Sequence, residues 1–182
     1  MTQLAIAKVP SPVGTIVLAA RDDRLVALEF AHRWPHRLAR LEQRFGPLAL
    51  RPASDPAGIV RRLESYLVGT LDALAPVVVD PGGTVFQRRV WHALREVPPG
   101  QTVSYRALAR AVGAPTAARA VGAANGANPI AIVIPCHRVI GADGRLSGYA
   151  GGVERKRWLL AHEAAGGRRP RADDPAHVRL RA

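Results

Sequence analysis

The chain's only cysteine lies in the stretch Ile132-Val133-Ile134-Pro135-Cys136-His137-Arg138-Val139-Ile140. Apolar residues flank it on both sides, a pattern that predicts burial. Pro135 cannot donate to a strand ladder, so we expect the thiol where a buried strand breaks into a turn. A thiol becomes a strong nucleophile when its surroundings favour the thiolate. His137 as a base and Arg138 as a fixed positive charge are adjacent candidates for that role.

Two interpretations of this cysteine stay open on the residues alone. A single cysteine in an apolar run is most often a small core residue with no chemistry. Successive residues of an extended chain point to opposite faces, so His137 meets the Cys136 sulfur only where the backbone turns, or through a water. Cys136 is therefore a candidate nucleophile whose partner the local spacing does not fix.

Two further segments accompany the cysteine and carry a resemblance to a known family. They are Ser147-Gly148-Tyr149-Ala150-Gly151-Gly152 and Arg155-Lys156-Arg157-Trp158-Leu159-Leu160-Ala161-His162-Glu163. With the cysteine stretch, they make the sequence similar to the O6-alkylguanine-DNA alkyltransferases, also called methylated-DNA–protein-cysteine methyltransferases. The resemblance is strong over residues 84–163 and looser over the first 80 residues. It implies an α/β (α+β) fold, with a ribonuclease-H-like N-terminal domain and a winged helix-turn-helix C-terminal domain.

Composition narrows the class of protein further. With 182 residues the chain is long enough to bury a core, as one domain or two small ones. No uncharged apolar run reaches the ~18 residues of a membrane span, and the first residues lack a signal-peptide layout. One cysteine excludes an intramolecular disulfide and a cysteine-rich zinc site. A free thiol is typical of the reducing cytoplasm, where we expect the protein to act, without a cofactor.

Positive charge dominates the chain. Lys and Arg number 26 against 14 acidic residues, which gives a formal net charge of +12. Such an excess favours a polyanionic partner such as double-stranded DNA, because neutralised phosphates release counterions. A general bias of the sequence toward Arg and Ala is the alternative explanation of the same charge.

The N-terminal part predicts a small sheet with two helices. Three β-prone runs, residues 4–9, 15–20 and 25–30, predict strands, and the last two are joined as a hairpin. Apolar spacing predicts a helix over residues 36–45 and a second helix that opens at Asp55-Pro56. The buried face of the second helix is expected to hold Ile59, Leu63, Tyr66 and Leu67.

The boundaries of the predicted domains follow from breaker residues. Prolines and paired glycines in residues 70–83 mark a linker with one short strand at 77–79. We expect an N-terminal domain over residues 1–75, a helical domain over 76–165 and a poorly ordered Arg/Pro tail over 166–182. His32 and His36 are four residues apart, but Pro35 prevents a regular helix across them and no third ligand is near. We therefore expect no metal site.

The C-terminal part predicts a helix-turn-helix. Thr84 is a candidate cap for one helix, Ser104 for a helix over residues 105–112, and Thr116 for a helix from 117 to about 124. Residues 141–144 form a predicted turn between Val139-Ile140 and Leu146, consistent with a small β-wing, and a last helix is predicted over 153–163. An ordinary helical hairpin is the alternative to a DNA-binding unit.

The predicted helix over residues 117–124 has unusually small side chains, with Arg119 as its only charge. Helices that read the major groove usually offer several polar side chains to base edges. This helix offers almost none, which favours close binding to the minor groove and an intercalating side chain. A solvated surface arginine is the alternative interpretation of Arg119.

The family resemblance implies roles for individual residues. It implies a relay from Cys136 through a water and His137 to Glu163, and Tyr105 as a donor to the base. Arg119 would be the arginine that fills the stack, and Asn128 the hinge asparagine. The base edge and the DNA would be contacted by Val139, Tyr149, Ala150, Ala118 and Gly122. Candidates for phosphate contacts, chosen by position, are Arg88, Arg89, Arg106 and Arg110.

The resemblance implies direct-reversal DNA repair. The alkyl group of O6-alkylguanine, and also of O4-alkylthymine, passes from duplex DNA to Cys136, the nucleotide is flipped, and the protein is consumed. A monomer that binds DNA cooperatively fits this function. The alternatives are a non-catalytic winged-helix DNA-binding protein and a cysteine hydrolase. One departure is Ala150, where relatives often carry a serine able to contact the substrate; this residue bears on the range of bulky alkyl groups.

Overall fold

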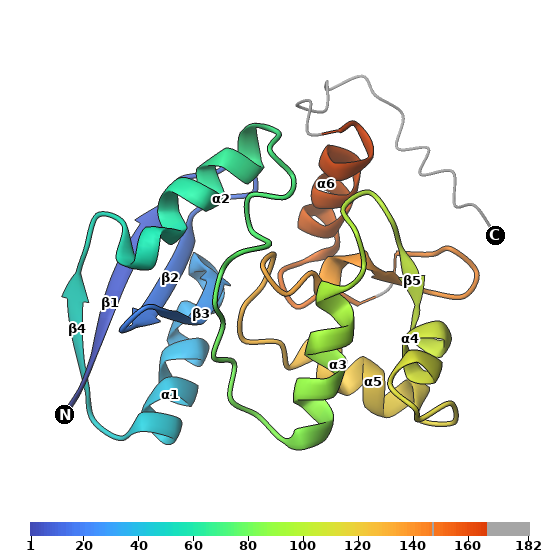
Figure 1. Cartoon of the computed structure of the whole chain (residues 1–182), viewed down its shortest axis with the longest axis horizontal. Helices are drawn as coiled ribbons and strands as arrows, with labels where there is room; N and C mark the ends of the chain where they lie inside the picture. The colour runs from blue at the N-terminus through green and yellow to red at the C-terminus, as the bar shows by residue number, and fades with distance from the viewer. Residues whose placement is uncertain (147, 167–182) are drawn as a thin grey trace.

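The computed structural model describes residues 1–146 and 148–166, and its N-terminal part is a four-stranded sheet (Figure 1). The strand order is β3-β2-β1-β4. β1 (Thr2–Val9) pairs antiparallel with β2 (Ile16–Arg21), which pairs antiparallel with β3 (Arg24–Phe30). These three predicted strands are confirmed. The fourth, β4 (Leu48–Pro52), was not predicted; it is a short edge strand that pairs with β1 alone, in parallel, and ends at a proline.

Two helices cover opposite faces of the sheet, as the alternation of strand side chains requires. α1 (Trp34–Phe45), preceded by the short 3-10 helix η1 (Ala31–Arg33), packs through Leu41 against Leu4, Ala19 and Val26. α2 (Ile59–Val68) packs on the other face with the four buried residues that were predicted for it. Its start differs from the prediction, because Pro56–Gly58 form a separate 3-10 turn, η2, before the helix begins.

The C-terminal part is helical and confirms two of the three predicted caps. Thr84 caps α3 (Val85–Arg95) in a reciprocal pair with Gln87, and Ser104 caps α4 (Tyr105–Ala111). The prediction for Thr116 is wrong: α5 (Ala118–Gly126) begins after Ala117, with no side-chain cap. The last helix, α6, spans Val153–Ala164.

The predicted β-wing is only partly present. Its turn forms, with the Gly141 N–H donating to the Arg145 carbonyl at 3.0 Å. β6 (Val139–Ile140), however, pairs in parallel with β5 (Val103–Ser104), and within residues 1–146 and 148–166 it forms no ladder with the chain after the turn. In the same way, the predicted strand at 77–79 amounts to one bridge between Val79 and Leu25 in the described part of the chain.

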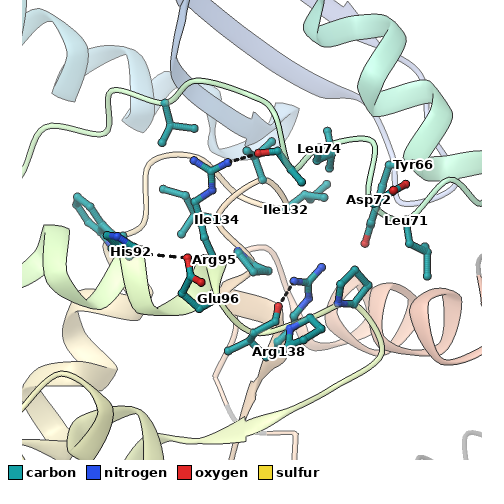
Figure 2. Close-up of a pocket in the computed structure, with 18 of the residues that line it drawn as sticks. Tyr66, Leu71, Asp72, Leu74, His92, Arg95, Glu96, Ile132, Ile134 and Arg138 are labelled. Carbon is teal, nitrogen blue, oxygen red and sulfur yellow. Dashed lines mark hydrogen bonds and ion pairs between the residues drawn. The ribbon is translucent and has the colours of Figure 1, made fainter.

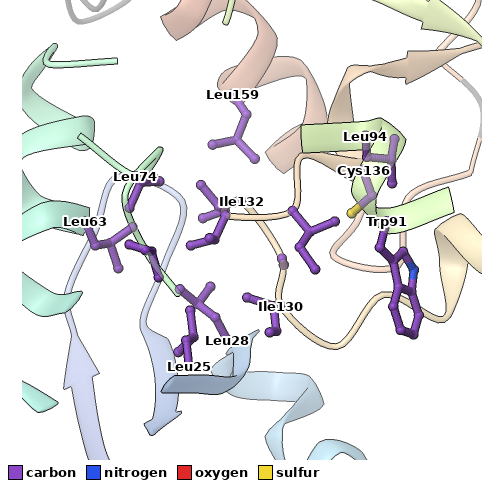
Figure 3. Packing of buried hydrophobic residues seen from close by; sticks show 14 of the residues in the cluster. Leu25, Leu28, Leu63, Leu74, Trp91, Leu94, Ile130, Ile132, Cys136 and Leu159 are labelled. Carbon is purple, nitrogen blue, oxygen red and sulfur yellow. The ribbon is translucent and has the colours of Figure 1, made fainter. Parts of the chain in front are cut away.

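The larger buried cluster joins β3 and α2 to the helices of the C-terminal part (Figure 3). Leu25 and Leu28 of β3 and Leu63 of α2 contribute from the N-terminal part, and Leu94 of α3 and Leu159 of α6 from the C-terminal part. The division into domains at residues 75 and 76 stays a prediction. The predicted tail lies outside the described residues from residue 167 onward.

Candidate active site

The part of the cysteine run before Cys136 does not form the expected strand but folds into successive tight turns, and only Val139–Ile140 at its end form a strand, β6. The Leu28 N–H of β3 donates to the Pro129 carbonyl at 3.0 Å, and the Ala131 N–H donates back to Leu28 at 2.9 Å. The chain then reverses at Ile132, whose φ of 68° is strained for a β-branched residue. Cys136 follows at the start of the 3-10 helix η3 (Cys136–Arg138). The predicted burial of the run and the turn at the thiol are therefore confirmed.

Asn128 holds both the turn and the thiol. Its Nδ2 donates to the Ile134 carbonyl at 2.8 Å and to the Cys136 Sγ at 3.0 Å, and its Oδ1 accepts from the Ile130 N–H at 3.0 Å. Burial raises the pKa of the Cys136 thiol to about 11, although the Asn128 hydrogen bond opposes that rise. At neutral pH the sulfur is therefore a thiol that needs a base before it can react.

The Cys136 thiol lies on a cavity of about 380 Å³, which falls within the ~300–1,000 Å³ typical of ligand sites. α5 contributes Gly122 to the lining, and a Cβ at this position would lie 3.7 Å from the ring of Tyr105, an ordinary van der Waals contact. The sequence-predicted residues on this cavity are Tyr105, Gly122, Asn128, Cys136, Tyr149 and Ala150. They come from α4, α5, the loop after α5, the cysteine run and the chain before α6.

A buried network lies beside the thiol. His137 is fully buried, and its Nε2 donates to Oε1 of Glu163 at 2.9 Å. The other ring nitrogen, Nδ1, is buried and has no hydrogen-bond partner among the described residues. With the proton on Nε2, the lone pair of Nδ1 is available as a base. The return of the last helix to His137, which the resemblance implied, is thus present.

Glu163 is held as an ion by several donors. Arg138 donates to it through Nη2 at 2.8 Å and through Nε at 3.0 Å, and the Gly100 N–H donates at 3.1 Å. Burial alone raises the pKa of Glu163, but His137 and Arg138 outweigh burial and hold the pKa well below its usual range. Burial also lowers the pKa of His137, against the attraction of Glu163, so the imidazole is neutral at pH 7.

The structure does not bring every predicted residue to the cavity. Arg119 is exposed on α5 and Ala118 is half-buried beside it, and neither lines the cavity. Val139 is fully buried, and its carbonyl accepts from Lys156 Nζ at 2.6 Å. Arg106 and Arg110 are exposed on α4. Arg89 donates to the Val112 carbonyl, and Arg88 to Gly83.

The site also includes residues that were not predicted as functional. Glu29 of β3 lines the cavity, and Tyr66 of α2 donates to Glu163. Lys156 of α6 is fully buried, and burial lowers its pKa to about 8. No local signal marks Glu29 or Tyr66, because their contacts join distant parts of the chain. Lys156 stood out only as one of two lysines.

A larger cavity, of about 480 Å³, lies behind the cysteine run (Figure 2). Its lining includes Ile132, Ile134, Tyr66 and Arg138, together with the linker at Leu71 and Leu74. Cys136 is not among its lining residues, so the smaller cavity is the one that can present a substrate to the thiol.

The described residues hold no group of three His, Cys, Asp or Glu side chains that could bind a metal ion. Within the same residues, no helix is long and apolar enough to cross a membrane.

Comparison with known proteins gives consistent matches. A family model described as "6-O-methylguanine DNA methyltransferase, DNA binding domain" matches residues 85–165. The methylated-DNA–protein-cysteine methyltransferase of Salmonella typhimurium is 46% identical over 170 residues, which cover 90% of this chain and 97% of the relative. The Mycolicibacterium paratuberculosis protein of the same name is 47% identical over 158 residues, covering 85% and 89%.

Solved structures agree with these relatives. The crystal structure of Mycobacterium tuberculosis OGT in complex with DNA has 41% identity and a TM-score of 0.76, and the match covers 90% of this chain and 95% of that one. The crystal structure of Mycobacterium tuberculosis O6-methylguanine methyltransferase has 42% identity and a TM-score of 0.74, with 95% and 97% covered. The mixed α/β fold predicted from the sequence is confirmed by this similarity.

Proposed function

Because the chain belongs to the methylated-DNA–protein-cysteine methyltransferase family and is a DNA-repair methyltransferase, we propose that Cys136 accepts the alkyl group and that each molecule reacts once. The proposed substrate is O6-alkylguanine in duplex DNA, with O4-alkylthymine as a second lesion. The observation that carries the proposal is the Cys136 thiol, held by Asn128 on a cavity beside the buried His137–Glu163 pair.

The proposed reaction begins with the thiol proton. A water between Cys136 and Nδ1 of His137 passes that proton to the imidazole, and Glu163 stabilises the imidazolium that forms. The sulfur then attacks the alkyl carbon, the S–C bond forms, and the C–O6 bond breaks with its electron pair on guanine. Tyr105 donates to the base as this charge develops. In the net reaction, the thiol proton replaces the alkyl group on guanine.

The product is a thioether, which no group of this chain can reverse. The sequence has no second cysteine that could attack the alkylated sulfur. No cofactor takes part in the proposed step, because the thiol itself is the acceptor. One protein molecule is therefore consumed for each lesion.

We propose that DNA meets the exposed face of α5. Arg119, Ala120 and Ala123 are exposed there, while Val121 and Ala124 are buried against the protein. The small residues allow close approach to the minor groove, and Arg119 fills the stack after the target nucleotide flips into the cavity. The net charge of +12 supports binding to phosphates, for which Arg106 and Arg110 remain the best placed of the four candidates.

The lining of the cavity bears on the range of alkyl groups that the protein accepts. Ala150 lines the cavity without a hydroxyl, so its backbone N–H is the group proposed to contact O6, and the fit of bulky alkyl groups depends on Tyr149 beside it. The proposed contact of Ala118 is through its backbone. Val139 is fully buried and its carbonyl accepts from Lys156, so it is less well placed for its proposed contact than the sequence implied. We also propose that the protein acts as a monomer in the reducing cytoplasm. It is proposed to bind cooperatively along DNA.

Intact-mass analysis tests the function directly. After incubation with a duplex that contains one O6-methylguanine, we expect each protein molecule to gain one methyl group and no more, even with excess substrate. Cys136→Ser is expected to gain none while it still binds DNA. DNA binding by the wild type with no gain in mass would instead favour the non-catalytic winged-helix alternative.

The role of Asn128 gives a prediction that needs no DNA. Asn128→Ala removes the Nδ2 donor to Sγ, so the thiolate loses stabilisation and the pKa of Cys136 rises above about 11. We expect alkylation of Cys136 by iodoacetamide at pH 8 to slow by about tenfold. Asn125→Ala is the matched control, since Asn125 donates to the Cys136 carbonyl and not to the sulfur. Equal slowing in both variants would contradict a direct effect on the thiol.

A further inference from the structure

The N-terminal part of the chain contributes a hydroxyl group to the hydrogen-bond network of His137 and Glu163. Tyr66 lies on α2, is 1% exposed, and donates through its phenol oxygen to Oε1 of Glu163 at 2.7 Å. The backbone carbonyl of Tyr66 accepts from Nε2 of His162 at 2.8 Å, and the two rings meet edge to face with centroids 5.4 Å apart. These contacts hold the hydroxyl in one position against α6.

Tyr66 shares its acceptor atom with the imidazole. Oε1 of Glu163 receives the His137 N–H at 2.9 Å, Arg138 Nη2 at 2.8 Å and the Tyr66 hydroxyl at 2.7 Å. Each donor draws electron density from the oxygen, so each lowers the strength with which that oxygen accepts from the others. Burial raises the pKa of Tyr66 well above its usual value, so the phenol stays protonated and remains a donor.

We infer that Tyr66 is a positioning residue for the alkyl transfer: its hydroxyl weakens Glu163 as an acceptor for His137 and so lowers the proton affinity of the imidazole. Because this step rests on the relay proposed above, it assigns a part in the same reaction to the N-terminal half of the chain. A less basic imidazole stays neutral, and hence able to take the thiol proton, at lower pH.

Other charged groups face the same site and set the direction of the expected change. Arg138 and Lys156 lower the pKa of His137, while Glu163 raises it, and burial is the largest influence. Cys136 adjoins the imidazole along the chain, and His162 lies behind Tyr66. Tyr66→Phe leaves all of these charges in place and removes one hydroxyl group. The hydrogen bond from His137 to Glu163 then strengthens, and the pKa of His137 rises.

Two measurements on Tyr66→Phe test the inference. The first is the pH dependence of single-turnover methyl transfer from duplex DNA, whose acidic limb is expected to move upward by about 0.5 to 1 pH unit. The second is the titration of the His137 imidazole by NMR in the DNA-free protein, which is expected to move in the same direction. Leu67→Val, a packing change on the same helix, is the matched control and should leave both curves in place.

The outcomes separate this inference from the proposed function. A Tyr66→Phe profile that is scaled down without displacement, together with an unmoved His137 titration, would show that Tyr66 only supports the fold. If the wild type takes up no methyl group, the proposed function fails, and the NMR titration still decides whether Tyr66 tunes His137. An equal displacement in Leu67→Val would also overturn the role of the hydroxyl.

Discussion

His137→Gln is expected to slow methyl transfer at pH 7 by on the order of 100- to 10,000-fold, the usual contribution of a general base. Glutamine keeps a donor for Glu163 but has no lone pair that can take a proton from the thiol at neutral pH. The wild-type rate should rise with pH through the pKa of His137, which burial holds below its usual value, and then level off. In the variant, the thiolate must form unaided.

The shape of the pH profile makes this prediction specific. With the base gone, the rate should follow the thiolate fraction and rise about tenfold per pH unit toward the Cys136 pKa of about 11. His92→Ala, which changes an exposed histidine on α3, is the control and should retain the wild-type plateau. A plateau near neutral pH in His137→Gln would contradict the relay.

Arg119→Ala is expected to slow transfer from duplex DNA by about 100-fold, because extrusion of a stacked base costs a few kcal/mol and the inserted side chain offsets that cost. Transfer from the free base O6-methylguanine needs no extrusion and should be nearly unchanged. Arg119 is exposed on α5, away from the cavity lining. This position is consistent with a large effect on duplex DNA and almost none on the free base.

A second arginine serves as the comparison for Arg119. Arg110→Ala should weaken DNA binding modestly and reduce the slope of log affinity against log salt by about one, as expected for one phosphate contact. Its rate on bound duplex should stay close to that of the wild type. Equal losses on duplex and free base in Arg119→Ala would remove the stacking role.

The sequence predicted those elements whose causes are local. Continuous β-prone runs marked β1, β2 and β3, and the side chains of Thr84 and Ser104 marked two helix starts. Thr116 failed as a cap because the chain makes another turn, with the Ala117 N–H bonded to the Ala114 carbonyl, before α5 begins. β4 was missed because its pattern is short and its pairing with β1 is a long-range event.

For the site as well, local features were predicted and long-range contacts were not. The motif located Cys136, His137, Asn128 and Glu163, and the fold brings them together. The apolar run before the thiol has the pattern of a strand, so neither the strained backbone at Ile132 nor the tight turns were predicted. Tyr66 lies 97 residues from Glu163 and looked only like a core position of α2, so a contact of that kind emerges only when the sheet and the helices pack.

The most direct measurement of the central claim is to locate the transferred methyl group by peptide sequencing. Trypsin is expected to release residues 120–138, which contain Cys136, the proposed acceptor, and His137, the proposed base. After reaction with O6-methylguanine duplex, fragment masses should place the whole of the methyl group on Cys136, at one per molecule. A methyl group on His137 or in any other peptide, or an unmodified Cys136 after the lesion has disappeared, would contradict the account.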